Sequence, residues 1–230
     1  MRVLKIMKNE ISMEKLIHKG AEASLVYGHW FGKEVIFKHR LPKGYRIEQI
    51  DKKLRINRTL NEAKALIRVK NYGVKVPQVY EIDSENSTIV MKYIKGEKLK
   101  DALSLITKDT KVRYLKELGR IIAILHKNGH IHGDITTSNV IITETQDIFI
   151  IDFGLHIYSD SIEDKSTDLH LFKRVLISSH GNDFNICFEA FLEGYRGGYG
   201  TEKKNECRKI IKNITIIETR GRYVKKEDRI

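Results

Sequence analysis

With 230 residues, the chain is long enough to bury one substantial core or two small lobes. Its 42 Lys and Arg residues against 30 Asp and Glu residues give a formal net charge of +12, which favours either a polyanionic partner or a solvated basic surface. No apolar run approaches the roughly 20 residues of a membrane span, and charges interrupt the N-terminal apolar residues too often for a signal peptide. The two cysteines lack metal-ligand spacing, so the sequence predicts a reduced, cytoplasmic protein.

The first predicted elements are β-strands. Residues 13–20, 23–31 and 34–40 are apolar and β-branched runs, with a turn at Gly32-Lys33. A helix is expected over 59–71, where apolar residues recur at helical spacing before Gly73. Two short strands follow, at 79–82 and 88–93. The first part of the chain therefore reads as a strand-rich lobe with one helix.

Residues 41–58 form a polar, basic segment between these elements. The window from Lys38 to Lys70 holds eleven basic and three acidic residues. A polyanionic partner and a solvated helix face explain this excess equally well.

The remainder of the chain is mostly helical. Residues 110–127 carry one apolar stripe, which is typical of an amphipathic helix. Strands are expected at 140–142 and 148–151, and helices at about 168–178, 184–193 and 202–213. The predicted organisation is an N-terminal lobe over 1–94, a C-terminal lobe over 95–219 and a basic tail over 220–230. The apolar stripe of residues 110–127 consists of Leu115, Leu118, Ile122 and Leu125.

The strongest chemical signal is His132-Gly133-Asp134, followed by Asn139 and then by Asp152-Phe153-Gly154. Phosphoryl transfer needs a carboxylate that orients the acceptor and oxygen ligands that hold Mg²⁺ against the phosphates. A loop with Asp134 and Asn139, followed by a β-hairpin that returns Asp152, matches the arrangement used by kinases. The sequence therefore predicts an α+β, bilobal, protein-kinase-like fold with Asp134 as the catalytic carboxylate and Asn139 and Asp152 as metal ligands.

Lys38 ends an apolar strand, and Glu62 lies in the helix that follows. In kinases a lysine on the third strand grips the ATP phosphates and pairs with a helical glutamate. With the downstream motif in place, this interpretation is preferred to two solvated side chains.

The loop expected to cover the phosphates lacks the usual G-x-G-x-x-G pattern. Gly20-Ala21-Glu22-Ala23 stands there, and Glu22 would repel phosphate unless it binds a metal or another side chain. Gly133 replaces the arginine that docks a phosphorylated activation segment in many kinases, so no such switch is expected.

The chain resembles the small, RIO-like atypical kinase subunit of the KEOPS (EKC) complex, the PRPK family, in its archaeal form. The resemblance covers nearly the whole chain. It rests on KGAEA (19–23), KGYR (43–46), RTLNEAKAL (58–66), GVKVPQVY (73–80), HGDITTSN (132–139), IDFGL (151–155), EDKSTDL (163–169) and RGR (220–222).

This resemblance implies a minimal bilobal kinase with Mg²⁺ and ATP as cofactors and with weak serine/threonine kinase and ATPase activity. Its complex makes threonylcarbamoyladenosine on tRNAs that read ANN codons. The implied partners are tRNA, a threonylcarbamoyl-transferase subunit on the C-terminal lobe and a small regulator on the N-terminal lobe. The implied ATP-binding residues are Ile17, Gly20, Ala21, Glu22, Ala23, Lys38, Met91, Lys92, Tyr93 and Ile94.

Two other interpretations stay open at this point. A small-molecule phosphotransferase of the aminoglycoside or choline type also uses HGD and a downstream Asn, but it usually has an acidic pair in place of Phe153-Gly154. A kinase-shaped scaffold without activity is the other alternative, and ATP turnover would separate it from an enzyme.

Overall fold

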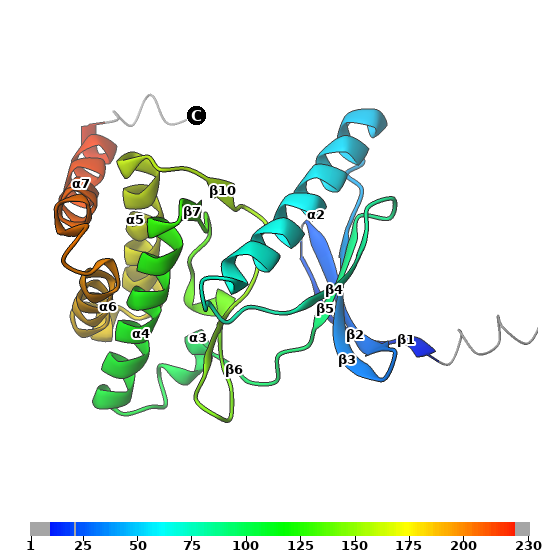
Figure 1. The fold of residues 1–230 in the computed structure, drawn as a ribbon, viewed down its shortest axis with the longest axis horizontal. Coiled ribbons are helices and arrows are strands. Elements are labelled where there is room, and N and C mark those ends of the chain that lie inside the picture. The colour runs from blue at the N-terminus through cyan, green and yellow to red at the C-terminus, as the bar shows by residue number, and fades with distance from the viewer. Residues whose placement is uncertain (1–9, 21, 224–230) are drawn as a thin grey trace, which may run out of the picture. The chain divides into compact units, whose positions relative to one another are not determined.

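The computed structural model describes residues 10–20 and 22–223, which fall into two compact units (Figure 1). Unit 1 comprises residues up to Asn71 together with Val76–Lys95, and unit 2 comprises Tyr72–Lys75 and the chain from Gly96 onward. The strand-rich first unit and the helical second unit confirm the predicted α+β, kinase-like fold class.

Unit 1 is built on an antiparallel five-stranded sheet in the order β1-β2-β3-β5-β4. In this register Lys38 of β3 lies opposite Leu25 of β2 and Ile89 of β5. The β2–β3 turn is at Phe31-Gly32, where both residues have positive φ. Side chains of Val35, Phe37 and Val90 form a buried cluster on the sheet. The strands are β1 (Ile11–Lys19), β2 (Ala23–Trp30), β3 (Lys33–Arg40), β4 (Val79–Asp83) and β5 (Thr88–Lys92).

Helix α2 (Glu48–Lys70) packs on this sheet and starts well before residue 59, so the predicted start of this helix was wrong. Its first turns lack a continuous apolar stripe, and Ile50 and Leu54 are exposed. Buried Asp51 instead binds Arg55 one turn later at 2.7 Å and Arg46 before the helix at 3.4 Å. An i,i+4 ion pair supports a helix without producing an apolar period.

Unit 2 is a group of helices in which α4 packs closely against α6. The predicted stripe of α4 is confirmed, because Leu115, Leu118, Ile122 and Leu125 are all buried. At the crossing, a Cβ on Gly119 or on Gly194 would collide with the backbone of the facing helix. The helices are α3 (Leu99–Ala102), α4 (Lys108–Lys127), α5 (Ile162–Ser179), α6 (Phe184–Tyr199) and α7 (Lys204–Tyr223).

Short strands position the loops of unit 2. The predicted hairpin is confirmed as β8 (Val140–Ile142) and β9 (Ile148–Ile150), joined to β6 (Glu97–Lys98). A second pair, β7 (His130–Ile131) and β10 (Ile157–Tyr158), joins the segments that flank the two kinase motifs.

The later helices are longer than predicted. Ser161 caps α5 by accepting hydrogen bonds from the backbone N–H groups of Glu163 and Asp164. Helix α6 runs through three glycines because two of them, Gly194 and Gly198, lie against α4. Helix α7 continues to Tyr223, so a tail does not begin at Arg220 as expected, and residues 224–230 lie outside the described part of the chain.

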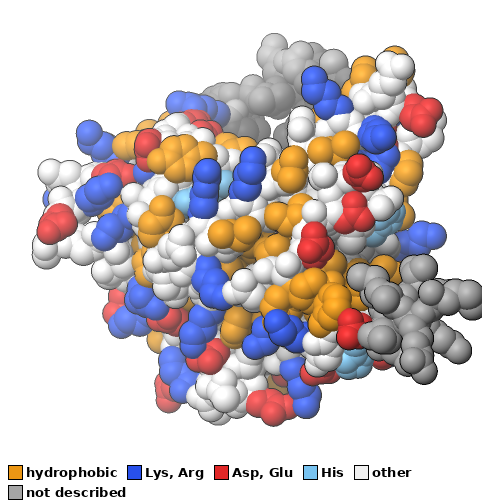
Figure 2. All heavy atoms as spheres, turned by 45° about the vertical axis from the view of Figure 1, so that its right-hand side comes forward, with side chains coloured by type: hydrophobic (Ala, Val, Ile, Leu, Met, Phe, Trp, Pro, Cys, Tyr) orange, Lys and Arg blue, Asp and Glu red, His pale blue; other side chains and the backbone are white. Residues whose placement is uncertain are grey.

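The basic excess is not gathered in one place on the face drawn in Figure 2, where blue side chains alternate with acidic and apolar ones. None of the helices in the described residues is both long and apolar enough to cross a membrane.

Candidate active site

One group of candidate site residues lies in unit 1, where Lys38 and Glu62 meet. The Lys38 Nζ donates a hydrogen bond to Glu62 Oε1 at 2.6 Å, and the Glu62 side chain is 1% exposed. Strand β3 supplies the lysine, and the second half of α2 supplies the glutamate. The structure therefore brings together the two residues that the sequence pattern paired.

Arg40 binds the same carboxylate and was not predicted. It lies two residues after Lys38 on the same face of β3, and its Nη2 donates to Glu62 Oε2 at 2.5 Å. The Arg40 side chain is buried, and its Nε has no hydrogen-bond partner among the described residues. Glu62 is thus shared by two buried cations. The sequence signal would have been a second basic residue at i+2 on the strand.

The loop before β2 explains how Glu22 is accommodated. Arg58 of α2 donates to the Glu22 carboxylate, and this hydrogen bond lowers the pKa of Glu22. The Gly20 N–H donates to the Ala23 carbonyl at 3.0 Å, which closes a tight turn. Ala21, expected in the same loop, lies outside the described residues. Glu22 therefore has the side-chain partner that the sequence analysis required.

The remaining predicted nucleotide-contacting residues are at the end of β5 and on β1. Met91 and Ile94 are buried, whereas Lys92 is exposed. Ile17 and Tyr93 line one pocket of about 440 Å³ together with Lys15 and Tyr27. The Tyr27 hydroxyl donates to Glu34 at 2.5 Å, and this hydrogen bond raises the pKa of Tyr27 to about 12.

Another group of candidate site residues lies in unit 2, where Asn139 holds Asp134. The Asn139 Nδ2 donates to the Asp134 carbonyl and to Asp134 Oδ2, both at 2.9 Å. This double contact fixes both side chains and leaves the amide oxygen of Asn139 as the atom suited to a cation.

His132 links this loop to the strand that leads to Asp152. Its Nδ1 accepts from the Asp134 N–H at 3.2 Å, so its Nε2 carries the proton that is donated to the Ile151 carbonyl at 3.2 Å. The Ile151 N–H in turn donates to the Asn139 carbonyl at 2.9 Å. Asp152 has a φ of 63°, a conformation that costs a non-glycine residue about 1–3 kcal/mol. These hydrogen bonds fix the loop and Asp152 relative to each other.

Asp168, on α5, fixes the backbone of the loop that carries Asp134. Its Oδ2 accepts from the His132 N–H at 3.0 Å and its Oδ1 from the Gly133 N–H at 2.9 Å. Buried His126 contacts the same carboxylate at 3.1 Å and the Tyr195 hydroxyl at 2.8 Å. Burial raises the pKa of Tyr195 well above its ordinary value, so this network contains a neutral phenol. None of these roles was assigned from the sequence.

Gly133 is required by the backbone at this position. Its φ is 81°, and a Cβ there would collide with the Leu155 carbonyl, just after the Asp152-Phe153-Gly154 motif. An arginine could not be accommodated without moving one of the two motifs. The structure thus gives a steric reason for the glycine.

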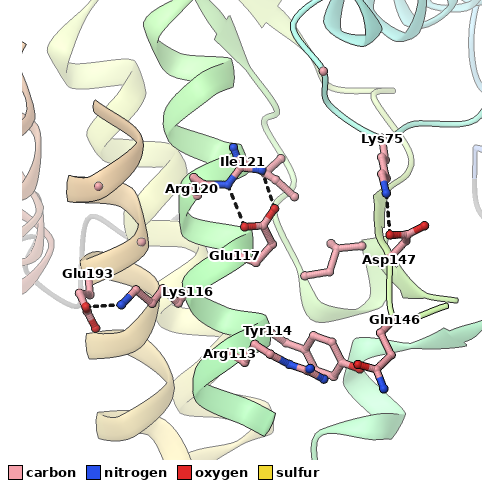
Figure 3. A pocket seen from close by; sticks show the side chains of 14 residues that line it. Lys75, Arg113, Tyr114, Lys116, Glu117, Arg120, Ile121, Gln146, Asp147 and Glu193 are labelled. Atoms are coloured by element: carbon pink, nitrogen blue, oxygen red, sulfur yellow. Dashed lines mark hydrogen bonds and ion pairs between the residues drawn. The ribbon is translucent and has the colours of Figure 1, made fainter. Parts of the chain in front are cut away.

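A separate pocket of about 670 Å³ in unit 2 lies between α4, α6 and the β8–β9 turn (Figure 3). Its three carboxylates are each bound by a basic side chain: Asp147 by Lys75, Glu117 by Arg120 and Glu193 by Lys116. None of the predicted site residues lines it.

Clusters of three or more His, Cys, Asp or Glu side chains that could cage a metal are absent from the described residues. Mg²⁺ is usually bound through one or two protein oxygens together with substrate phosphates and water. The oxygen donors of Asn139 and Asp152 fit that mode of binding rather than a dedicated protein cage.

Comparison with known proteins gives a consistent result. The family model described as "RIO domain" matches residues 37–169. The chain is 44% identical to the KEOPS complex subunit Bud32 of Pyrococcus abyssi, over 91% of this chain and 96% of that protein. It is 40% identical to a probable bifunctional tRNA threonylcarbamoyladenosine biosynthesis protein of Methanocaldococcus jannaschii, over 92% of this chain and 37% of that protein. A protein of the same description from Methanococcus maripaludis is 38% identical, and the chain spans 38% of its length.

Proposed function

This chain belongs to the RIO family and, within it, to the family of the KEOPS subunit Bud32, and from that premise we propose that it is a Mg²⁺- and ATP-dependent phosphotransferase and ATPase. We propose further that it supports threonylcarbamoyladenosine modification of tRNAs that read ANN codons. The bifunctional relatives, which contain a matching segment, carry that modification in their names.

The observation that carries this proposal is the pair of hydrogen bonds by which Asn139 fixes Asp134. A carboxylate fixed by two hydrogen bonds from one amide can accept or orient the proton of a protein hydroxyl or of water. Asn139 and Asp152 would bind Mg²⁺ through oxygen, and the cation would supply neutralisation of the charge that develops on the phosphates. Lys38, fixed by Glu62, would bind the α- and β-phosphates.

The nucleotide would bind at the residues inferred from the resemblance, which are Ile17, Gly20 to Ala23, Lys38 and Met91 to Ile94. The pocket shared by Ile17 and Tyr93 supports this assignment, because an adenine ring needs an apolar surface beside backbone polar groups. Arg58 keeps the Glu22 carboxylate neutralised within the loop that we assign to the phosphates.

We propose the cytoplasm as the site of action and other KEOPS subunits as partners. A threonylcarbamoyl-transferase subunit would bind the C-terminal lobe, and a small regulator would bind the N-terminal lobe. Transfer RNA is the proposed polyanionic partner. Within the basic window from Lys38 to Lys70, Arg46 and Arg55 bind Asp51, so Lys52 and Lys53 are the better candidates for that contact on α2.

The test is ATP turnover by the purified full-length chain, with Asp134→Asn and Asp152→Ala variants. Loss of a positioned general base typically costs about 10²–10⁴-fold, so D134N should lose turnover while nucleotide binding is nearly retained. D152A should lose both turnover and its dependence on Mg²⁺ concentration. Turnover that persists in D134N with unchanged kcat would contradict the assignment.

A further inference from the structure

A pocket of about 740 Å³ between the end of α6 and the first turns of α7 is lined by four basic residues and no acidic residue. The cations are Arg196 at the end of α6 and Lys204, Arg208 and Lys212 on α7. All four side chains are exposed. Within the described residues none of them takes part in an ion pair or in a side-chain hydrogen bond.

This arrangement contrasts with the pocket in Figure 3, which is also lined by four basic residues. There, three carboxylates neutralise three of the four cations. In the α6–α7 pocket no acidic side chain among the described residues pairs with the cations, although the two pockets belong to the same unit. Bringing four like charges together without a counterion is unfavourable unless an anion binds among them.

The spacing of the cations indicates which kind of anion would fit them. Lys204, Arg208 and Lys212 follow one another at i, i+4 and i+8, so they lie on one face of α7. At a rise of about 1.5 Å per residue they extend over about 12 Å. A single phosphate would contact only part of this row, whereas a polynucleotide backbone presents phosphates along all of it.

The floor of the pocket adds an apolar component. Cys207 is buried and Ile211 is half-buried between the cations. Burial raises the pKa of the Cys207 thiol, so the floor carries no negative charge at neutral pH. Gly200, with a φ of 71°, and Thr201 form the turn at one end, where backbone can approach a bound chain closely.

From these observations we propose that the α6–α7 pocket is an RNA-binding site that contacts the phosphate backbone through Arg196, Lys204, Arg208 and Lys212. The site is separate from the residues assigned to ATP and Mg²⁺. The proposal goes beyond the phosphotransferase activity and rests only on the proposed association with tRNA. An acidic surface of a protein partner is the competing occupant, and the experiment distinguishes it.

The experiment measures binding of a fluorescently labelled, unmodified tRNA transcript to the full-length chain over a series of salt concentrations. The triple variant K204Q/R208Q/K212Q should lower the slope of log K against log salt by about 2–3, because each lost phosphate contact contributes about 0.7–0.9. The matched control K64Q/R68Q/K108Q removes the same charge from exposed positions outside the pocket. It should change the slope much less.

Three further readouts keep the test decisive. The charge-preserving variant K204R/R208K/K212R should retain RNA binding, and denaturant unfolding should show that every variant is folded. ATP turnover should be unchanged in all of them, which separates failure of this proposal from failure of the proposed function. Equal loss of slope in the matched control would overturn the proposal, because only the total charge would then matter. Binding of a labelled polyglutamate peptide through the pocket, without RNA binding, would overturn it in favour of an acidic protein surface.

Discussion

Asp168 accepts hydrogen bonds from the backbone N–H groups of both His132 and Gly133, one on each carboxylate oxygen. The loop that carries Asp134 is therefore held by a buried side chain on α5 and not only by its own sequence. Because Asp168 is bound by His126, and His126 by Tyr195, the support extends through α4 to α6.

Asp168→Asn should lower kcat for ATP turnover by about 10²-fold, the effect of a displacement of about 1 Å in a catalytic group. The amide has a single acceptor oxygen, so one of the two loop N–H groups would face a donor. KM for ATP should change much less, because Asp168 is not among the residues proposed to contact the nucleotide. Tyr195→Phe, which removes only the distal hydrogen bond to His126, is the matched control and should cost less. An unaltered kcat in D168N would refute the positioning role.

Glu62→Gln should destabilise the fold by about 3–5 kcal/mol, because it removes the buried charge that binds both Lys38 and Arg40. Glu22→Gln removes an exposed ion pair with Arg58 and should cost about 0–1 kcal/mol. Urea unfolding of the two variants beside the parent chain measures the difference. Similar losses of stability in both variants would contradict the buried position of the Lys38–Glu62–Arg40 cluster.

Asp152→Gly should be more stable than Asp152→Ala by about 1 kcal/mol. Both variants lack the carboxylate and should lack turnover, but only alanine keeps a Cβ at a φ of 63°. Thermal or denaturant unfolding of this pair isolates the backbone strain from the lost side chain. If alanine proved the more stable of the two, the left-handed conformation of residue 152 would be wrong.

Stability should fall between pH 7.5 and pH 5.5, partly through His180. Burial lowers the pKa of His180 below 6.5, and its Nε2 contacts the hydroxyl of buried Thr137 at 3.1 Å. Above pH 6.5 both the folded and the unfolded chain hold this imidazole neutral. As the pH falls, the unfolded chain takes up the proton first. The stability that the neutral His180 imidazole contributes is therefore lost as the pH passes through the lowered pKa of His180 in the folded chain. His180→Gln should show a smaller fall over the same range, and an identical fall would assign the effect to other groups.

The sequence was most informative where a local pattern decides the structure. The apolar period of α4 predicted its buried face, and the spacing of Asp134, Asn139 and Asp152 predicted a loop followed by a hairpin. Lys38 and Glu62 could be paired because the downstream motif is that of a kinase, in which a lysine on the third strand pairs with a helical glutamate.

The parts that could not be predicted depend on contacts between distant segments. Nothing near His132 indicates that Asp168 binds its backbone, and nothing near Glu62 indicates that Arg40 shares it. The start of α2 was missed because Asp51 and its arginines stabilise that turn through charge rather than through an apolar stripe. Counting charges also overestimated the basic surface available between residues 38 and 70, since Arg46 and Arg55 bind Asp51.

The close crossing of α4 and α6 at Gly119 and Gly194 also bears on the order in which the protein folds. The two helices are separated in the chain by the catalytic loop, the hairpin and α5, so their contact joins segments far apart in sequence. Contacts of this kind form slowly, because the intervening chain must first be confined. Helix α4 leads into the loop that carries Asp134, and Tyr195 of α6 is linked to that loop through His126 and Asp168. Asp134 and Asn139 should therefore acquire their final positions only in the last stages of folding.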